Sequence, residues 1–188
     1  MEFQLIRAVP QDAKALACIM ETVTTGMNNP EWFMDDDEDY ITAHIGHTPL
    51  CKEDVGFIIK AVADVDGKEV LAGFFMVAFP GPVEKNLGNH IEMSTEELCG
   101  VAHMDSVVIL PEFRGYGLQS KLVNKAEEIL LKETDYRVCM CTVHPDNKYS
   151  LNNMLNHGYK VVAEALKYGG YRRFILKKEI RYEKAKSF

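Results

Sequence analysis

One segment near the middle of the chain restricts the possible folds more than any other. The apolar run 107–110 is typical of the end of a buried strand, which Pro111 stops. Arg114, Gly115 and Gly117 then form a tight turn, and a helical pattern begins directly after it. Glycines let successive N–H groups point into one concavity, and a helix N-terminus adds unpaired N–H groups and a positive dipole end. The segment therefore predicts a strand-turn-helix unit that binds a phosphate or pyrophosphate.

Two known phosphate-binding loops do not fit this segment. A Walker A loop ends in Gly-Lys-Ser/Thr, which is lacking, and G-x-G-x-x-G requires a third glycine where the chain has Ser120. An ordinary strand-to-helix turn that uses glycine only for its geometry is the simplest alternative. A nucleophile elbow of the form G-x-S-x-G is absent, so the sequence does not indicate a Ser-His-Asp hydrolase.

The remaining patterns predict a mixed α/β protein of the α+β type. Two apolar runs are joined by Asp66-Gly67, a strong hairpin signal. Beyond residue 100 the order strand, helix, strand implies a parallel pair with a crossover helix, attached to an antiparallel meander. Residues 81–100 are polar and irregular, long enough for a functional loop. The expected strands are 3–8, 56–65, 70–79, 101–110, 137–143, 159–166 and 171–177, and the expected helices are 11–26, 36–45, 118–132 and 147–156.

Composition narrows the class of protein. No linker or repeat divides the 188 residues, so we expect a single domain over 1–188. The net charge is −7 and no basic patch dominates, which excludes a dedicated nucleic-acid surface. The apolar runs are too short to span a membrane, no signal peptide is evident, and five unpatterned cysteines suit a reducing compartment. We therefore expect a cytoplasmic protein. The acidic run 35–39 either steers a cationic amine or, more simply, is solvated surface at a helix start.

The segment resembles motif A of the GNAT N-acetyltransferase superfamily, V-x-P-x-x-R-G-x-G, whose core reads Q/R-x-x-G-x-G/A. Arg114, Gly117 and Gln119 occupy the three marked positions, although a small residue is usual at the last. Downstream, 147–150 (Asn-Lys-Tyr-Ser) and then 158–159 (Gly-Tyr) are similar to the family's N-x-x-S/A…G-F/Y helix. The resemblance implies a GNAT domain with a mixed central sheet of about seven strands, a parallel splayed pair and flanking helices. It also implies acetyl-CoA as cosubstrate and no metal.

The resemblance further implies which residues bind acetyl-CoA. Strand backbone groups would run along the pantetheine arm, and N–H groups of the turn would hold the pyrophosphate, with Arg114 shaping the loop. Asn147 would sit where the parallel strands splay, and one N–H near Ile109 would polarise the thioester carbonyl. The implied residues are Val107, Val108, Ile109, Arg114, Gly115, Tyr116, Gly117, Leu118, Gln119, Ser120, Asn147 and Ser150.

The usual acid and base positions of the family are substituted in this chain. The tyrosine expected four residues after Ser150 is Met154, and the glutamate that some members place five residues before Asn147 is Thr142. Two functions remain open. One is an active N-acetyltransferase, in which a primary amine of a small molecule or peptide attacks acetyl-CoA directly. The other is a catalytically inactive CoA-binding sensor or regulator with the same fold.

Candidate catalytic residues come first from the strand that enters motif A. Strand alternation places His103, Asp105 and Val107 on one face. His103 matches the place where another branch of the family carries its base, and a histidine titrates near neutrality. A histidine that merely bonds a neighbour is the alternative. For the acid, Tyr149, Tyr168 and Tyr171 are candidates and are otherwise packing aromatics. The predicted catalytic residues are His103, Asp105 and Tyr149.

Three further features receive simple interpretations. Cys139 and Cys141 share a strand face while His144 lies on the other, so buried structural cysteines are predicted rather than a metal site. Trp32 and its neighbour Phe33 either line the acceptor cleft or pack the second helix. The last strands offer an exposed edge through which a homodimer could form.

Overall fold

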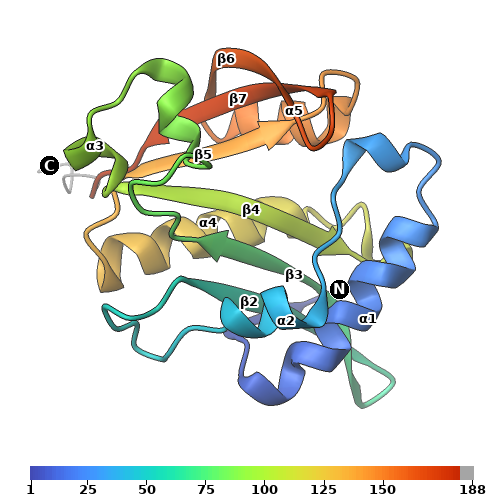
Figure 1. The fold of residues 1–188 in the computed structure, drawn as a ribbon. Helices are drawn as coiled ribbons and strands as arrows, with labels where there is room; N and C mark the ends of the chain where they lie inside the picture. Colours follow the sequence, from blue (N-terminus) through green and yellow to red (C-terminus); the bar gives the residue numbers. More distant parts are fainter. Residues whose placement is uncertain (183–188) are drawn as a thin grey trace, which may run out of the picture.

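A mixed sheet of seven strands, with helices on both faces, forms the centre of the computed structural model, which describes residues 1–182 (Figure 1). The strand order is β1-β2-β3-β4-β5-β7-β6. Within the described residues only β4 and β5 run parallel, and every other neighbouring pair is antiparallel. The strands are β1 (Phe3–Arg7), β2 (Gly56–Val65), β3 (Lys68–Ala78), β4 (Val101–Ile109), β5 (Val138–Val143), β6 (Lys160–Lys167) and β7 (Tyr171–Glu179). The predicted fold class and seven-stranded sheet are confirmed.

Local sequence explains the two hairpins of the sheet. Asp66 and Gly67 both have positive φ angles, 53° and 76°, as the predicted tight turn between β2 and β3 requires. Gly169 and Gly170, with φ angles of 83° and 112°, occupy the connection between β6 and β7. Both hairpins therefore lie where the sequence predicted them, at Asp66-Gly67 and at Gly169-Gly170.

The helices begin and end near their sequence signals. They are α1 (Ala13–Thr25), α2 (Glu38–Ala43), α3 (Thr95–Leu98), α4 (Leu118–Glu133) and α5 (Lys148–Asn156). The second helix was predicted over 36–45 but is shorter, because Asp37 is its N-cap and accepts a 2.8 Å bond from the Tyr40 N–H. Residues 81–100 are also less irregular than predicted. They contain the 3₁₀ helix η3 (Leu87–Ile91) and α3, whose start is a capping box formed by Ser94 and Glu97.

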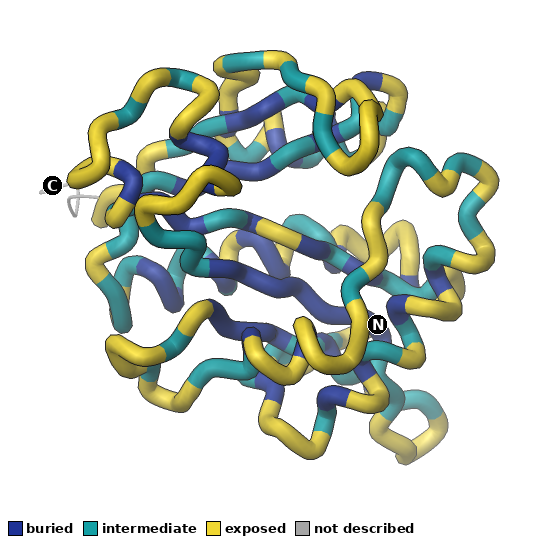
Figure 2. The backbone as a smooth tube through the Cα atoms, viewed as in Figure 1, coloured by how far each residue is buried: buried dark blue, intermediate teal, exposed yellow. Residues whose placement is uncertain are grey.

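The core lies on both faces of the sheet. The helices α4 and α5 cover one face, where their buried residues pack with β2, β3 and β5. The helix α1 and Ile41 of α2 cover the other face of β2, β3 and β4. Figure 2 shows the central strands as the most continuously buried part of the backbone. Cys139 and Cys141 are both buried on the α4 side, as predicted for structural cysteines.

The parallel strands β4 and β5 pair over a short stretch and then separate. Their register runs from Val101↔Val138 to His103↔Met140 and ends there, although both strands continue. Figure 1 shows the two strands diverging toward the side on which α1 lies. The predicted splayed pair is therefore present, and beyond His103 the edges of both strands face a gap.

A β-bulge in β4 corrects the predicted alternation of side chains. The register passes from Met76↔Ser106 directly to Val77↔Met104, so Asp105 is an extra residue without a partner on β3. Side chains beyond the bulge therefore change face. Val107 packs with the α4 cluster, like Met104. The prediction that Val107 shares a face with His103 is therefore wrong. The bulge turns Asp105 and its neighbour Ser106 toward the side of α1 and α2.

No helix among residues 1–182 combines the length and apolarity needed to cross a membrane.

Candidate functional site

The turn between β4 and α4 leaves a run of backbone N–H groups open. Gly115 and Gly117 adopt φ angles of 83° and 68°, which other residues rarely adopt. Within residues 1–182, the first N–H after the turn that donates to a protein acceptor is that of Lys121, 3.1 Å from the carbonyl of Gly117. The N–H groups of residues 115–120 therefore have no protein acceptor within residues 1–182, and they lie at a helix N-terminus, where the dipole favours an anion.

Side chains brace this turn from two sides. The Nε atom of Arg114 donates to the carbonyl of Ile109 at 3.3 Å, which ties the turn back to β4. The hydroxyl of Ser120 lies 2.7 Å from Nε2 of His157, at the end of α5. A Cβ atom added at Gly117 would meet no heavy atom within 4 Å. The turn is thus braced on two sides and has open space beside Gly117, which is compatible with a phosphate group at the neighbouring N–H groups.

The other motif A side chains serve packing. Leu118 is 2% exposed and Val108 1%, so neither side chain is available to a ligand. Tyr116 packs edge-on against Phe3, with ring centroids 6.0 Å apart. Gln119, in the first turn of α4, is half-buried. Leu118 and Val108 can therefore contact a ligand only through their backbone.

The diverging edge of β4 presents backbone groups to the gap. The N–H of Leu110 donates to Ala72 of β3 at 3.0 Å. Because successive N–H groups of an extended strand point to opposite sides, those of Ile109 and Val107 point toward β5. The β4–β5 pairing ends at His103, so these two N–H groups lie outside it. An extended ligand with amide groups, such as the pantetheine arm of coenzyme A, fits this edge like an added strand.

The second motif forms the start of α5. Asn147 is the N-cap, and its side-chain oxygen accepts a 3.1 Å bond from the Ser150 N–H. Gly158 ends the helix with a φ angle of 84°, as predicted. The oxygen of Asn147 is thus engaged in the cap, and its amide nitrogen is the group left to contact a ligand near the splay.

A cavity of about 680 Å³ opens beside the splayed strands. Met104 and Asp105 of β4 and Cys141 and Thr142 of β5 reach it, so the cavity extends into the gap between these strands. Its outer walls come from the segment before α2, the start of the η3 segment and the β6–β7 connection. Further lining residues are Trp32, Phe33, Met34, Asp36, Tyr40, His44, Lys85, Leu87, His103, Ser106, Lys167, Tyr168 and Arg173.

Two carboxylates meet in this cavity. Asp36 accepts a 3.0 Å bond from the hydroxyl of Ser106, and Asp105 accepts a 3.1 Å bond from the hydroxyl of Tyr40. Desolvation, followed by the charge of Asp105, raises the pKa of Asp36 to about 6. Desolvation also raises the pKa of Asp105, against the hydrogen bond from Tyr40. Asp105 is open to the cavity but otherwise surrounded by protein, which explains this desolvation.

His103 lies in the same cavity with one ring nitrogen engaged. Its Nε2 accepts a 3.1 Å bond from the backbone N–H of Leu87, which anchors η3 to β4. In a neutral ring the hydrogen is therefore on Nδ1. Desolvation, followed by the charge of Lys167, lowers the pKa of His103 to about 4. A base needs a free lone pair and a pKa near the working pH, and both observations favour the carboxylates over His103.

The three candidate tyrosines occupy different places. Tyr168 lines the cavity, its hydroxyl lies 3.1 Å from that of Thr142, and its ring lies under the guanidinium of Arg173 at 5.2 Å. Desolvation raises the pKa of Tyr168, so its hydroxyl stays protonated at neutral pH. Tyr149 is 89% exposed and Tyr171 45%, and neither lines the cavity. Of the predicted catalytic residues, the cavity brings together His103 and Asp105 but not Tyr149.

The fold and site define a class of α+β protein in which a helix N-terminus with open N–H groups lies beside two diverging parallel strands. A sequence model of the Acetyltransferase (GNAT) family matches residues 23–159. This match spans most of the chain, including both strands, the glycine turn and the second motif. The chain belongs to the GNAT acetyltransferase family.

Solved structures share the fold at low sequence identity. The acetyltransferase of the GNAT family from Streptococcus pneumoniae has a TM-score of 0.65 and 18% identity, covering 95% of this chain and 100% of that one. The ribosomal-protein-alanine N-acetyltransferase of Brucella melitensis has a TM-score of 0.63 and 17% identity, covering 94% and 99%. NAA60 of Arabidopsis thaliana in complex with acetyl-CoA has a TM-score of 0.69 and 13% identity, covering 95% and 99%. No curated protein sequence matches the chain significantly.

Sequence patterns did not identify the residues that bring the second carboxylate to the cavity. The run 35–39 was interpreted either as steering a cationic amine or, more simply, as solvated surface, and neither interpretation distinguished Asp36 from its neighbours. Tyr40 was not singled out. Asp36 bonds to a residue 70 positions away, across the molecule. Asp37, its neighbour, does have the simple capping role. Because residues 35–39 are five consecutive acidic residues, the sequence gave no signal that could separate these two roles.

Proposed function

We propose that this chain is an N-acetyltransferase that transfers the acetyl group of acetyl-CoA to a primary amine of a small molecule or peptide by direct attack in a ternary complex. The observation that carries the proposal is the continuity of the cavity with the gap between β4 and β5. Asp105 and Thr142 of these strands line both, so an amine in the cavity can meet a thioester in the gap. Proximity of this kind supplies a large part of an acyltransferase's rate.

Acetyl-CoA supplies an activated acyl carbon. The residues that fit its parts are those that the resemblance to the family's motifs implies. The N–H groups of 115–120 fit the pyrophosphate, with Arg114 holding the turn. The edge of β4 at Val107 and Ile109 fits the pantetheine amides, and the Ile109 N–H fits the carbonyl oxygen as negative charge develops there. A preorganised donor at this position is worth about 3 kcal/mol.

The carboxylate pair is the best candidate for the proton acceptor. An acceptor amine arrives as an ammonium ion and must lose two protons to become an amide: one reaches the departing thiol and the other reaches solvent. Asp36 and Asp105 attract the ammonium and take its first proton, directly or through water. A pKa near 6 lets Asp36 be ionised at neutral pH and still accept a proton readily.

Tyr168 is the best candidate for the proton donor to the thiolate. Its hydroxyl reaches the cavity from the β6–β7 connection and bonds to Thr142 of β5, next to the gap. Met154, at the family's usual acid position, is buried in the core and has no proton to give. A hydroxyl from another element thus replaces the missing one, which favours an enzyme over the inactive sensor.

Two assays test the proposed function. Calorimetry with acetyl-CoA should give micromolar binding, and thiol release should be detected with at least one member of an amine panel. The panel should include zwitterionic amines, because Lys85 and Lys167 line the cavity together with the carboxylates. Binding without turnover on any amine would support the sensor. Absence of binding would mean that the glycine turn is only a turn.

We also propose that the chain forms a homodimer through β6. This strand is one edge of the sheet, and Val161 and Leu166 on it are 44% and 68% exposed. An exposed edge with apolar side chains tends to find a partner. Light scattering over a range of protein concentrations tests this: a constant monomer mass would rule the dimer out.

A further inference from the structure

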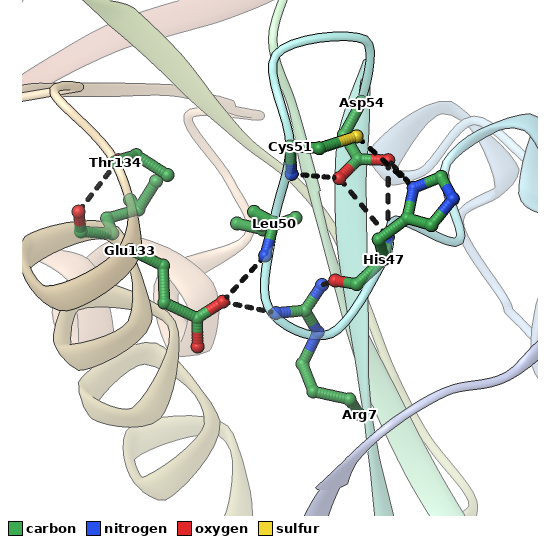
Figure 3. Close-up of polar contacts among 8 residues, drawn as sticks. Arg7, His47, Leu50, Cys51, Asp54, Glu133 and Thr134 are labelled. Atoms are coloured by element: carbon green, nitrogen blue, oxygen red, sulfur yellow. Dashed lines mark hydrogen bonds and ion pairs between the residues drawn. The ribbon is translucent and has the colours of Figure 1, made fainter.

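The loop between α2 and β2 carries three metal-ligand side chains in close proximity. His47, Cys51 and Asp54 converge at one end of the loop, far along the chain from the glycine turn (Figure 3). Their ligand atoms all lie within 4.8 Å of one another. Among residues 1–182, no other three histidine, cysteine or acidic side chains meet in this way. The cluster lines no part of the cavity described above.

The donor atoms form a compact set. Nδ1 of His47 lies 2.8 Å from Oδ1 of Asp54 and 3.3 Å from Sγ of Cys51. Zinc–ligand bonds of about 2.0–2.3 Å place tetrahedral ligand atoms roughly 3.4–3.6 Å apart. Small side-chain rotations would therefore open the cluster enough for an ion to replace the hydrogens that the three groups now share. Imidazole, thiolate and carboxylate together form a donor set that suits zinc.

The loop backbone is anchored independently of the cluster. Arg7 donates from Nη2 to the His47 carbonyl at 2.8 Å and from Nη1 to Glu133 at the end of α4 at 3.3 Å. The same Glu133 oxygen accepts the Leu50 N–H at 3.1 Å. Figure 3 shows these contacts on the side of the loop opposite the His47 ring. The ligands are thus carried by a backbone that is already fixed, which lowers the entropy cost of ion binding.

The cluster is accessible to an ion from one side. The side chain of Asp54 is 5% exposed, while that of His47 is 75% exposed, so an ion can approach from the histidine side. Oδ2 accepts the Cys51 N–H at 2.8 Å, and both oxygens of Asp54 accept the backbone N–H of His47 at 3.2 Å. Oδ1, which lies 2.8 Å from Nδ1 of His47, is the oxygen nearest the other donor atoms.

We propose that His47, Cys51 and Asp54 form a zinc-binding site, with water completing the tetrahedron. A thiolate and a carboxylate balance the two positive charges of the ion. The site takes no part in acetyl transfer and does not depend on the proposed function. His44 and Val55, on either side of this loop, line the acceptor cavity, so a bound ion steadies one wall of it.

Zinc titration of the full chain tests the proposal. Protein stripped with a chelator and kept reduced with a phosphine should bind one zinc ion with a dissociation constant of micromolar or below. Cys51→Ser and His47→Gln should weaken binding at least tenfold. Cys18→Ser and Cys99→Ser are matched controls, because both thiols are exposed and lie outside the cluster, and they should bind as the parent does. Equal zinc affinity in Cys51→Ser and the parent, or no binding by the parent, would overturn the site.

Cobalt gives a readout specific to the thiol. Cobalt bound to the parent should show thiolate-to-metal charge-transfer absorption in the near ultraviolet, and Cys51→Ser should abolish it while Cys18→Ser retains it. Circular dichroism establishes that each variant is folded. Acetyl-CoA binding, measured in parallel, should be the same with and without zinc, which separates this site from the acyltransferase site. Charge-transfer absorption that persists in Cys51→Ser would assign the metal elsewhere.

Discussion

Asp36 and Asp105 enter one cavity from distant parts of the chain, and the charge of Asp105 adds to desolvation in raising the pKa of Asp36 to about 6. Asp36 comes from the segment before α2, and Asp105 is the extra residue of the β4 bulge. The hydroxyl of Ser106 on β4 donates to Asp36, and the hydroxyl of Tyr40 on α2 donates to Asp105. A pair of carboxylates with raised pKa values in a cleft is a common property of catalytic sites.

The pH dependence of turnover should report Asp36. Because its carboxyl group must lose a proton to attract and deprotonate an ammonium ion, kcat/KM should rise with pH through about 6. Asp36→Asn should remove this limb and lower kcat/KM at pH 7 by about 10²-fold. A second limb at higher pH, from the amine substrate, should stay in place.

The same profile discriminates between Asp36 and His103. The lowered pKa of His103 would place its limb near pH 4. His103→Gln should leave the limb near pH 6 unchanged. A limb near pH 4 that disappears in His103→Gln and persists in Asp36→Asn would instead assign the base to the histidine.

Asp36→Asn should stabilise the folded protein although it lowers activity. Its folded pKa is raised from an ordinary value near 3.8 to about 6, so the folded state binds the proton more tightly than the unfolded state. The cost of ionising Asp36 is absent below about pH 4 and complete above pH 6. After discounting for solvent around the partly exposed carboxylate, Asp36→Asn should stabilise the protein by about 1–2 kcal/mol at pH 7.5. Urea unfolding at pH 7.5 and 4 measures this: equal effects at both pH values would contradict it.

Local signals made most of the fold predictable. Three features depend on φ angles that few residues adopt, so they could be predicted from the sequence. They are the Asp66-Gly67 turn, the glycine turn after β4 and the end of α5 at Gly158. The β4 bulge was not, because a strand with one inserted residue still alternates on each side of it. Asp36 could not be assigned either, since its role arises from a tertiary contact with Ser106 that no local pattern encodes.

Tyr168→Phe should slow the chemical step. The substitution removes the hydroxyl that bonds to Thr142 but keeps the ring under Arg173, so the fold should be retained. We expect kcat to fall about 10²-fold with little change in acetyl-CoA affinity. Tyr149→Phe is the matched control, because that ring is 89% exposed outside the cavity, and it should leave kcat unchanged. Steady-state kinetics separates them, and a loss of kcat in Tyr149→Phe alone would place the acid on α5.

Gly117→Val should weaken acetyl-CoA binding through the geometry of the turn. Gly117 has a φ angle of 68°, and a side chain there must either accept strain of about 1–2 kcal/mol or change the backbone. A changed backbone would turn the N–H groups of 115–120 away from one concavity, so calorimetry should show affinity reduced at least tenfold.

Gly67→Val is the matched control for that variant. Gly67 has a similar φ angle of 76° and equally open surroundings, but it lies in the β2–β3 hairpin. It should lose comparable stability without losing affinity for acetyl-CoA. Since both variants carry the same kind of strain, a difference in affinity between them measures the turn's contribution to binding. Equal affinities in the two variants would show that the open N–H groups at the start of α4 do not bind the pyrophosphate.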